Sequence, residues 1–335
     1  MASRPLYEEL DRGVEALLAG DEPRPVPAGT ELPGLLDLAA ELRGLPSDAF
    51  RAELRAELMA LAALQGAKEG GTMTTEVAGM REGFHTVTPY LTVRGAAQLV
   101  DFVKAAFGAE ELHRTTGSAG GLHAELRIGD SMLMLGGSPE MPFDEQPGAL
   151  HLYVPDVDAA YERALAAGAT SVMGPTDQEY GDRDAALRDP FGNFWYVGTR
   201  KGPGGPVPAG LRSVTPYLQP RGAADLADFL ARALGAEELE RHASPDGVIH
   251  HAKLRLGDSV VELGEAHGPF PALRVMLYLY VPDVDALYAR AVRAGATPMQ
   301  PPADQPYGDR TAHVKDPAGN SWYLATPVPG APAKP

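Results

Sequence analysis

Hydrophobic positions over residues 84–200 follow two periods in turn, and the same succession returns over residues 211–327. Apolar residues at every second position predict strands, whereas apolar residues three and four apart predict helices. In the first copy the order is a strand, a helix and three strands, and this order then occurs again. The predicted strands are 87–93, 111–115, 122–128, 131–135, 149–154, 171–173, 185–188 and 194–197, and the predicted helices are 96–107 and 157–167.

Short motifs offset by 127 positions relate the two copies. Thr-Pro-Tyr-Leu at 88–91 returns at 215–218, and Asp-Pro-x-Gly-Asn at 189–193 returns at 316–320. This offset is close to the size of a domain, whereas solenoid repeats have periods of about 20–50 residues. The chain is therefore predicted to hold two tandem α+β domains, at residues 84–200 and 211–327.

Residues 1–72 have a different pattern, in which leucines recur at helical spacing without strand-like alternation. We expect a small helical N-terminal region, whose leucine stripe either packs within the chain or binds a protein partner. A composition rich in Gly, Thr or Pro predicts linkers at 73–83 and 201–210, and a tail at 328–335.

The composition narrows the classes of partner. The formal net charge is -16 and the pI is near 5.0, which argues against binding to nucleic acid or to an anionic membrane. No apolar run approaches the length of a membrane span or a signal sequence, so a cytoplasmic protein is expected. The absence of cysteine excludes disulfides, thiolate nucleophiles and Cys-ligated metals.

The ordered set of motifs carries a family resemblance. A paired βαβββ unit with Gly-Ala-Glu-Glu after its first helix (108–111 and 235–238) and Asp-Pro-x-Gly-Asn before its last strand resembles the vicinal oxygen chelate superfamily. That superfamily includes glyoxalases, bleomycin-resistance proteins and extradiol dioxygenases. The resemblance implies tandem glyoxalase-like domains, each of two paired βαβββ modules whose sheets cup a cavity. In the enzymes it also implies a divalent metal held by His and Glu.

The sequence departs from the superfamily where the enzymes hold that metal. The strand positions that the resemblance assigns to metal ligands are Thr88, Met134, Ala149 and Tyr196 in the first copy and Thr215, Glu262, Met276 and Tyr323 in the second. Only Glu262 is an ordinary ligand of a hard metal, and a catalytic ion usually needs about three protein ligands. We therefore expect no metal cofactor.

An alternative metal site lies nearby in the first copy. His123 and Glu125 are two residues apart and share one face of a predicted strand, and His151 lies on the next module. Two imidazoles and one carboxylate suit a divalent metal such as Fe, Mn, Ni or Zn. The second copy has Lys253 in place of Glu125, so such a site would belong to the first domain alone.

Alternation along the strands predicts the side chains that line the cavities. They are Thr88, Tyr90, Met132, Met134, His151, Tyr153, Phe194 and Tyr196 in the first domain, and Thr215, Tyr217, Glu262, Tyr278, Tyr280 and Tyr323 in the second. An aromatic, Met-rich lining is typical of a pocket for a flat organic ligand, although a packed barrel core has the same composition. Arg183 and Arg310 follow Tyr-Gly-Asp and would either bind a ligand carboxylate or phosphate or pair within their own turn.

Three functions follow from these observations. The favoured one is a metal-free protein, similar to the bleomycin-resistance branch, that binds a small aromatic or cationic molecule. The second is a metal-dependent lyase, isomerase or dioxygenase that uses His123, Glu125 and His151. The third is a regulatory or scaffold protein that acts through the N-terminal helices.

Overall fold

The structure is a computed structural model that describes residues 77–116, 120–140, 145–202 and 205–330. The helices predicted over residues 1–72, the first part of the 73–83 linker and the end of the 328–335 tail lie outside the described residues. In the described part of the chain no helix is long and apolar enough to cross a membrane.

Each repeat holds two βαβββ modules in the predicted order. The first repeat consists of β1 (Val87–Thr92), α4 (Ala96–Phe107), β2 (Glu110–Thr116), β3 (Leu122–Ile128), β4 (Ser131–Gly137), β5 (Ala149–Tyr153), α5 (Val157–Ala166), β6 (Thr170–Asp177), β7 (Asp182–Arg188) and β8 (Phe194–Arg200). The second consists of β9 (Val214–Leu218), α6 (Ala223–Leu234), β10 (Glu237–Ala243), β11 (Ile249–Leu256), β12 (Ser259–Leu263), β13 (Met276–Tyr280), α7 (Val284–Arg293), β14 (Thr297–Asp304), β15 (Asp309–Lys315) and β16 (Ser321–Pro327).

Local sequence signals set the ends of the helices. Helix α5 begins at Asp156, whose carboxylate accepts the Ala159 N–H at 3.0 Å, and α7 begins at Asp283 in the same way. Helices α4 and α6 end at Gly108 and at the matching glycine of the second repeat, both in the left-handed conformation that glycine adopts without a steric penalty.

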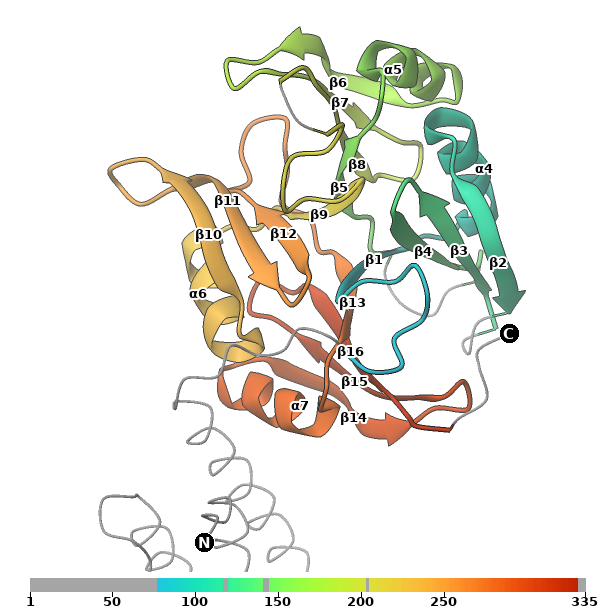
Figure 1. Ribbon diagram of the computed structural model, residues 1–335, viewed down its shortest axis with the longest axis vertical. Coiled ribbons are helices and arrows are strands. Elements are labelled where there is room, and N and C mark those ends of the chain that lie inside the picture. Colours follow the sequence, from blue (N-terminus) through green and yellow to red (C-terminus); the bar gives the residue numbers. More distant parts are fainter. Residues whose placement is uncertain (1–76, 117–119, 141–144, 203–204, 331–335) are drawn as a thin grey trace, which may run out of the picture. The chain divides into compact units, whose positions relative to one another are not determined.

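The strands form two eight-stranded sheets, and each sheet combines one module of the first repeat with one module of the second (Figure 1). Sheet A has the order β14-β15-β16-β13-β1-β4-β3-β2, and sheet B has the order β10-β11-β12-β9-β5-β8-β7-β6. The joins are the antiparallel pairs β1–β13 and β5–β9. The predicted fold class of tandem, cupped βαβββ domains is confirmed.

The predicted grouping of cavity residues needs correction, because each cup is formed between the repeats. Thr88 on β1 lies opposite Tyr278 on β13, and His151 on β5 lies opposite Thr215 on β9. Side chains assigned to one cavity from the sequence are thus divided between two sheets. Alternation shows which side chains share a face of a strand, but it does not show which module completes the sheet.

The hydrophobic cores, in contrast, follow the repeats. In the first repeat α4 and α5 pack together with the backs of β1–β4 and β5–β8, so that Leu133 of sheet A and Trp195 of sheet B belong to one core. The second repeat forms an equivalent core around α6 and α7. Each fully buried Leu or Phe contributes about 1.5–3 kcal/mol, so these cores hold the two sheets back to back.

The Asp-Pro-x-Gly-Asn motif supports this packing as well as forming a turn. Both oxygens of the buried Asp189 carboxylate are engaged: one accepts the N–H groups of Phe191 and Asn193, and the other accepts the Asn193 amide and the Trp195 indole N–H. The second repeat has the same contacts to its buried aspartate and tryptophan. The motif therefore fixes the last strand of each repeat against its helices.

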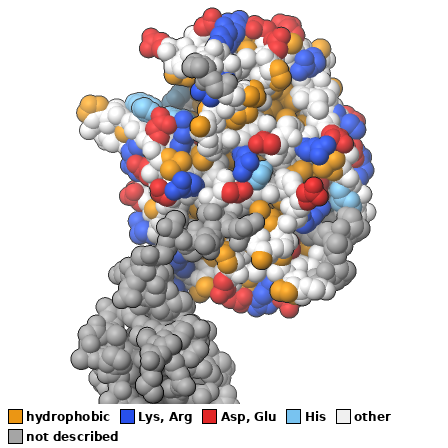
Figure 2. All heavy atoms as spheres, in the orientation of Figure 1, with side chains coloured by type: hydrophobic (Ala, Val, Ile, Leu, Met, Phe, Trp, Pro, Cys, Tyr) orange, Lys and Arg blue, Asp and Glu red, His pale blue; other side chains and the backbone are white. Residues whose placement is uncertain are grey.

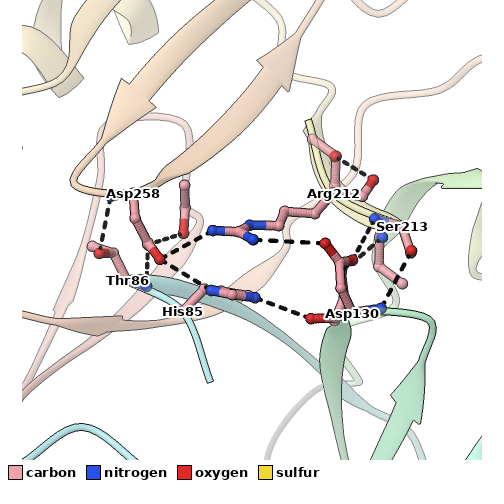
Figure 3. Close-up of polar contacts among 10 residues, drawn as sticks. His85, Thr86, Asp130, Arg212, Ser213 and Asp258 are labelled. Atoms are coloured by element: carbon pink, nitrogen blue, oxygen red, sulfur yellow. Dashed lines mark hydrogen bonds and ion pairs between the residues drawn. The ribbon is translucent and has the colours of Figure 1, made fainter. Parts of the chain in front are cut away.

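A polar seam joins the two repeats (Figure 3). The turn residue Asp130 accepts the Ser213 N–H at 2.9 Å, and its counterpart Asp258 accepts the Thr86 N–H at 2.8 Å. The imidazole of His85 lies between them, with Nδ1 3.0 Å from the Asp258 carboxylate and Nε2 3.0 Å from the Asp130 carbonyl. The pKa of His85 is raised, mainly by the hydrogen bond to the Asp258 carboxylate and also by the one to the Asp130 carbonyl, because both favour the protonated ring.

Acidic and basic side chains are interspersed on the face shown in Figure 2. Among the described residues, charges also pair across neighbouring strands, as Arg127 of β3 and Glu110 of β2 do at 2.5 Å. On the described part of this face, positive charge is therefore not gathered into one continuous surface.

Candidate functional site

The concave face of sheet A, here called cup A, is filled by the chain itself. Residues 77–84, just before β1, loop over β13 and β16 (cyan in Figure 1). Val77 and Phe84 are buried among the side chains of the cup, which are Met132, Met134, Tyr278, Tyr280 and Ala325, with Met80, Tyr90 and Tyr323 packed against them. Residues 77–84 are called the plug below.

The plug places a cation in the centre of cup A. The Arg81 guanidinium donates to both oxygens of Glu125, at 2.5 and 2.6 Å, and lies over the Phe84 ring at 4.6 Å from its centroid. His123 Nε2 lies 3.3 Å from the same carboxylate. Burial alone would raise the pKa of Glu125, but the contacts with His123 and Arg81 lower it to about 2. Glu125 is therefore a charged carboxylate at neutral pH.

The concave face of sheet B, here called cup B, has a different centre. The Glu262 carboxylate accepts from two imidazoles, since His151 Nδ1 lies 2.8 Å from Oε2 and His251 Nε2 lies 3.2 Å from Oε1. Glu262 is 1% exposed. Burial opposes its charge, but the two histidines outweigh burial and lower the pKa of Glu262, while Glu262 raises the pKa of His151 against its own burial.

One end of cup B is aromatic. Tyr196 and Tyr217 pack with ring centroids 4.8 Å apart, and Phe270 lies 5.7 Å from Tyr196. A cavity of about 100 Å³ opens here, lined by these three rings with Gln219, His250, Glu265 and His267. The Gln219 oxygen accepts the Tyr196 hydroxyl at 2.7 Å, while its buried Nε2 has no hydrogen-bond partner among the described residues.

The opposite end of cup B carries carboxylates. Tyr153 donates to Asp182 at 3.0 Å, and the hydroxyl of Tyr180 donates to one oxygen of Asp184. The other oxygen of Asp184 is buried and has no partner among the described residues. A Cβ on Gly198 would lie 2.6 Å from that oxygen, so glycine leaves it room. Burial is the main cause that raises the pKa of Asp184.

The predicted ligand-binding residues are shared between the two cups. Cup A holds Tyr90, Met134, Tyr278, Tyr280 and Tyr323, and cup B holds His151, Tyr153, Tyr196, Tyr217 and Glu262. Arg183 lies outside the cups, where it forms two hydrogen bonds to Asp158 of α5 at 2.7 and 2.8 Å. Arg310 makes the same pair with Asp285 of α7. Both guanidinium groups are thus already paired with carboxylates of the chain itself.

The register of the sheets shows which residues are level with the positions that the resemblance assigns to metal ligands. His151, and not Ala149, lies directly opposite Thr215 and Tyr196. The corresponding residue in cup A is Tyr278, which lies opposite Thr88 and Tyr323, rather than Met276. Alternation alone does not separate Ala149 from His151, because residues two apart lie on the same face of a strand.

With this register the donor sets do not fit the superfamily's metal. Cup A offers Thr88, Met134, Tyr278 and Tyr323 at those positions, and cup B offers Thr215, Glu262, His151 and Tyr196. In cup B both carboxylate oxygens of Glu262 already accept from imidazoles. Within the described ranges, no group of three or more His, Cys, Asp or Glu side chains is arranged to hold a metal ion.

The alternative set of His123, Glu125 and His151 is not brought together. His123 and Glu125 lie on β3 of sheet A, whereas His151 lies on β5 of sheet B and contacts Glu262. Glu125 is instead paired with Arg81. The two histidines belong to the same repeat but to different sheets, so they do not form one metal site with Glu125.

Sequence reasoning missed several residues of the cups. Asp184 directly precedes the strand predicted at 185–188, and extending that strand by one residue would have found it. Gln219 follows the repeated Thr-Pro-Tyr-Leu motif on the same face as Tyr217, a weaker signal. Arg81 had no signal, because it lies in a segment whose composition indicates a linker.

Comparison with known proteins agrees with this architecture. The sequence model of the Glyoxalase/Bleomycin resistance protein/Dioxygenase superfamily matches residues 83–197 and 217–324. The chain therefore belongs to that superfamily, with one match in each repeat.

The chain is also similar to a curated protein in sequence and to solved structures in fold. An uncharacterized protein of Mycobacterium bovis is 43% identical over 123 residues, which cover 33% of this chain and 81% of the relative. The crystal structure of glyoxalase I from Zea mays matches with a TM-score of 0.55 at 18% identity, over 71% of this chain and 90% of that one. A putative dioxygenase from Bacillus subtilis matches with a TM-score of 0.50 at 15% identity, over 72% and 85%.

Proposed function

We propose that this chain binds a small, flat aromatic molecule with a cationic group in cup B, without a metal. The observation that carries the proposal is the buried Asp184 oxygen that has no hydrogen-bond partner in the described part of the chain. A buried polar atom without a partner costs about 1–3 kcal/mol, and a cationic or N–H group of a ligand would remove that cost.

The rest of cup B fits the body of such a ligand. Tyr196, Tyr217 and Phe270 provide aromatic faces, which attract both flat rings and cations. The free amide nitrogen of Gln219 at that end can donate to an acceptor group of the ligand. The proposed ligand thus lies along the cup, with its cation toward Asp184 and an acceptor toward Gln219.

The metal-free part of the proposal follows from the use of Glu262. Its two oxygens are held by His151 and His251, so the carboxylate that the superfamily's enzymes give to a metal serves here in a hydrogen-bonded group. Metal content of the purified full chain tests this part. We expect less than stoichiometric Fe, Mn, Ni or Zn; a stoichiometric metal that Glu262→Gln removes would contradict it.

Ligand binding is tested with a matched pair of probes, 1-methylquinolinium and its neutral isostere 1-methylnaphthalene, by calorimetry on the full chain. We expect the cation to bind more tightly. Asp184→Asn should weaken the cation by at least about tenfold, which is about 1.4 kcal/mol, and leave the neutral probe unchanged. Gly198→Ala should weaken both, because the new methyl group occupies the space beside Asp184.

The control is Asp177→Asn, which removes an exposed carboxylate of the adjacent strand β6 that pairs with Arg183 and Lys201. This variant should bind both probes as the wild type does. Equal affinity of the two probes, or an equal loss of cation binding in Asp177→Asn and Asp184→Asn, would argue against a cation site at Asp184.

A further inference from the structure

We propose that cup A is a second ligand site, specific for guanidinium or amidinium compounds, and that Arg81 of the chain's own plug keeps it closed. The site would open when such a compound takes the place of the Arg81 head group on Glu125. The proposal concerns sheet A alone and is independent of ligand binding in cup B.

The first step is the shape of the charge in cup A. Glu125 is 3% exposed, and both of its oxygens point at one guanidinium in the two-pronged geometry that planar cations form with carboxylates. A single ammonium group has no pair of parallel, coplanar N–H donors, so it cannot match both oxygens in this way. The cup therefore selects a planar, two-donor cation.

The second step is the aromatic surrounding of that cation. Arg81 lies over the Phe84 ring, and Phe84 packs edge-to-face on Tyr280 with centroids 6.3 Å apart. Tyr278 and Tyr280 form the wall beyond, 5.2 Å apart, and these two rings stay in the cup when Phe84 leaves with the plug. A planar cation is attracted to such aromatic faces, and an aromatic ring carried by the ligand can pack on the same tyrosines, which favours aromatic amidines.

The third step is that side chains hold the plug in place. Among the described residues, the backbone hydrogen bonds of 77–84 are the two turns Met80 N–H to Val77 O and Phe84 N–H to Arg81 O. The plug adds no strand to sheet A. Its departure would break the contacts of Arg81, Val77 and Phe84 but no hydrogen-bonded ladder, so a ligand competes with only a few side chains.

The fourth step is the comparison with the other repeat. The residue 127 positions after Arg81 is Pro208, which has no charge to place in cup B. In that segment Val207 accepts from Arg200 through its carbonyl, at 3.4 Å. In cup B the buried carboxylate is that of Glu262 on β12, and it is bound by His151 and His251 rather than by an arginine. A self-supplied cation is thus a property of cup A, where the duplicated scaffold has diverged.

The test replaces Arg81 in the full chain and supplies its head group as a free compound. Arg81→Gln leaves the Glu125 charge without its cation, and we expect a fall in Tm of roughly 3–10 °C. Ethylguanidinium should restore the Tm in a saturable way, with one molecule bound per chain, and methylammonium should restore it much less. The double variant Arg81→Gln/Glu125→Gln should not respond.

The matched control is Arg127→Gln. Arg127 lies on β3, the strand of Glu125, and its guanidinium pairs with Glu110 at the surface. Ethylguanidinium should not change its Tm. An equal response of Arg127→Gln and Arg81→Gln, or of the double variant, would overturn the proposal by showing that the effect does not occur at Glu125.

A second measurement needs no substitution, so it also covers the case in which Arg81→Gln does not fold. In the wild-type chain, benzamidinium should increase the hydrogen exchange of the Met80 and Phe84 amides, because the plug leaves the cup as the ligand enters. Unchanged or slower exchange of these amides under saturating benzamidinium would mean that the plug is a fixed part of the core, and the proposal would fall.

Discussion

His151 and Glu262 are 111 residues apart and belong to different repeats, yet His151 Nδ1 lies 2.8 Å from the Glu262 carboxylate in the centre of cup B. The other copy has different residues at these two positions: Tyr278 corresponds to His151, and Met134 corresponds to Glu262. The contact is thus a product of divergence after duplication, and it exists only because β5 and β9 pair across the repeats.

This pair should give the fold a stability maximum on the pH scale. The pKa of Glu262 is lowered, so its contribution is present above the ordinary carboxyl pKa of about 4.3 and is lost as the pH falls below it. The pKa of His151 is raised, so its contribution is present below its ordinary value of about 6.5 and is lost as the pH rises through the raised value.

Denaturant unfolding of His151→Gln across pH checks this expectation. Between these limits the variant should lose about 3–5 kcal/mol, because Glu262 is left buried with a weaker partner. The loss should shrink at both ends. His242→Gln is the control, since His242 pairs with Glu240 at an exposed site; a pH-independent loss in His151→Gln would contradict the coupling.

His313 on β15 should destabilise the fold in mild acid. It is stacked on Tyr323 with the ring planes 9° apart, and burial, with a smaller contribution from Lys315, lowers its pKa to about 4. The neutral form is therefore favoured in the folded state. Its contribution is fully present above about pH 6.5 and is lost as the pH falls toward 4, up to about 3 kcal/mol.

The variant His313→Phe removes this titration while keeping an aromatic ring on Tyr323. Its free energy of unfolding should exceed that of the wild type at pH 5 by more than at pH 8. The comparison is made by denaturant unfolding at the two pH values. A constant difference between them would show that His313 does not titrate in this way.

The turn aspartates of the seam between the repeats should contribute to the stability of the fold. Asp258 accepts from the Thr86 backbone at 2.8 Å and from Ser259 Oγ at 2.9 Å, and it contacts His85 at 3.0 Å. Asp258→Ala removes these acceptors and should cost about 1–3 kcal/mol in unfolding free energy. Asp246→Ala, at an exposed turn whose contacts are local, should leave the midpoint unchanged; similar losses in both would argue that the seam is not special.

Cation binding in cup B should strengthen as the pH rises. Burial raises the pKa of Asp184, and only the ionised carboxylate attracts a cation. Affinity for 1-methylquinolinium should therefore increase with pH through the raised Asp184 pKa, whereas affinity for 1-methylnaphthalene should stay flat. Titrations between pH 4 and pH 6 separate the two, because the raised pKa of the neighbouring His151 keeps its charge constant over that range. The pH dependence should vanish in Asp184→Asn, and its persistence there would assign the effect to another group.

Most of the helices and strands of this chain could be predicted from the pattern of neighbouring residues. The alternation at 122–128 and the helical spacing at 96–107 predicted β3 and α4 with the same bounds that the structure shows, since each depends on neighbours a few positions away. The short strand expected at 171–173 proved to be longer, Thr170–Asp177, because its exposed edge carries little apolar signal. Aromatic cup residues such as Tyr196 and Tyr217 were found in the same way, from the face of their strand.

The sequence by itself determined the modules, their duplication, the family and the side chains that face the concave sides. Only the tertiary structure decided which modules share a sheet, and therefore that His151 meets Glu262 and that Arg81 enters the cup of Glu125. The physical reason is that periodicity reports the two faces of each element, while partners more than 40 residues apart are chosen by the packing of the whole sheet.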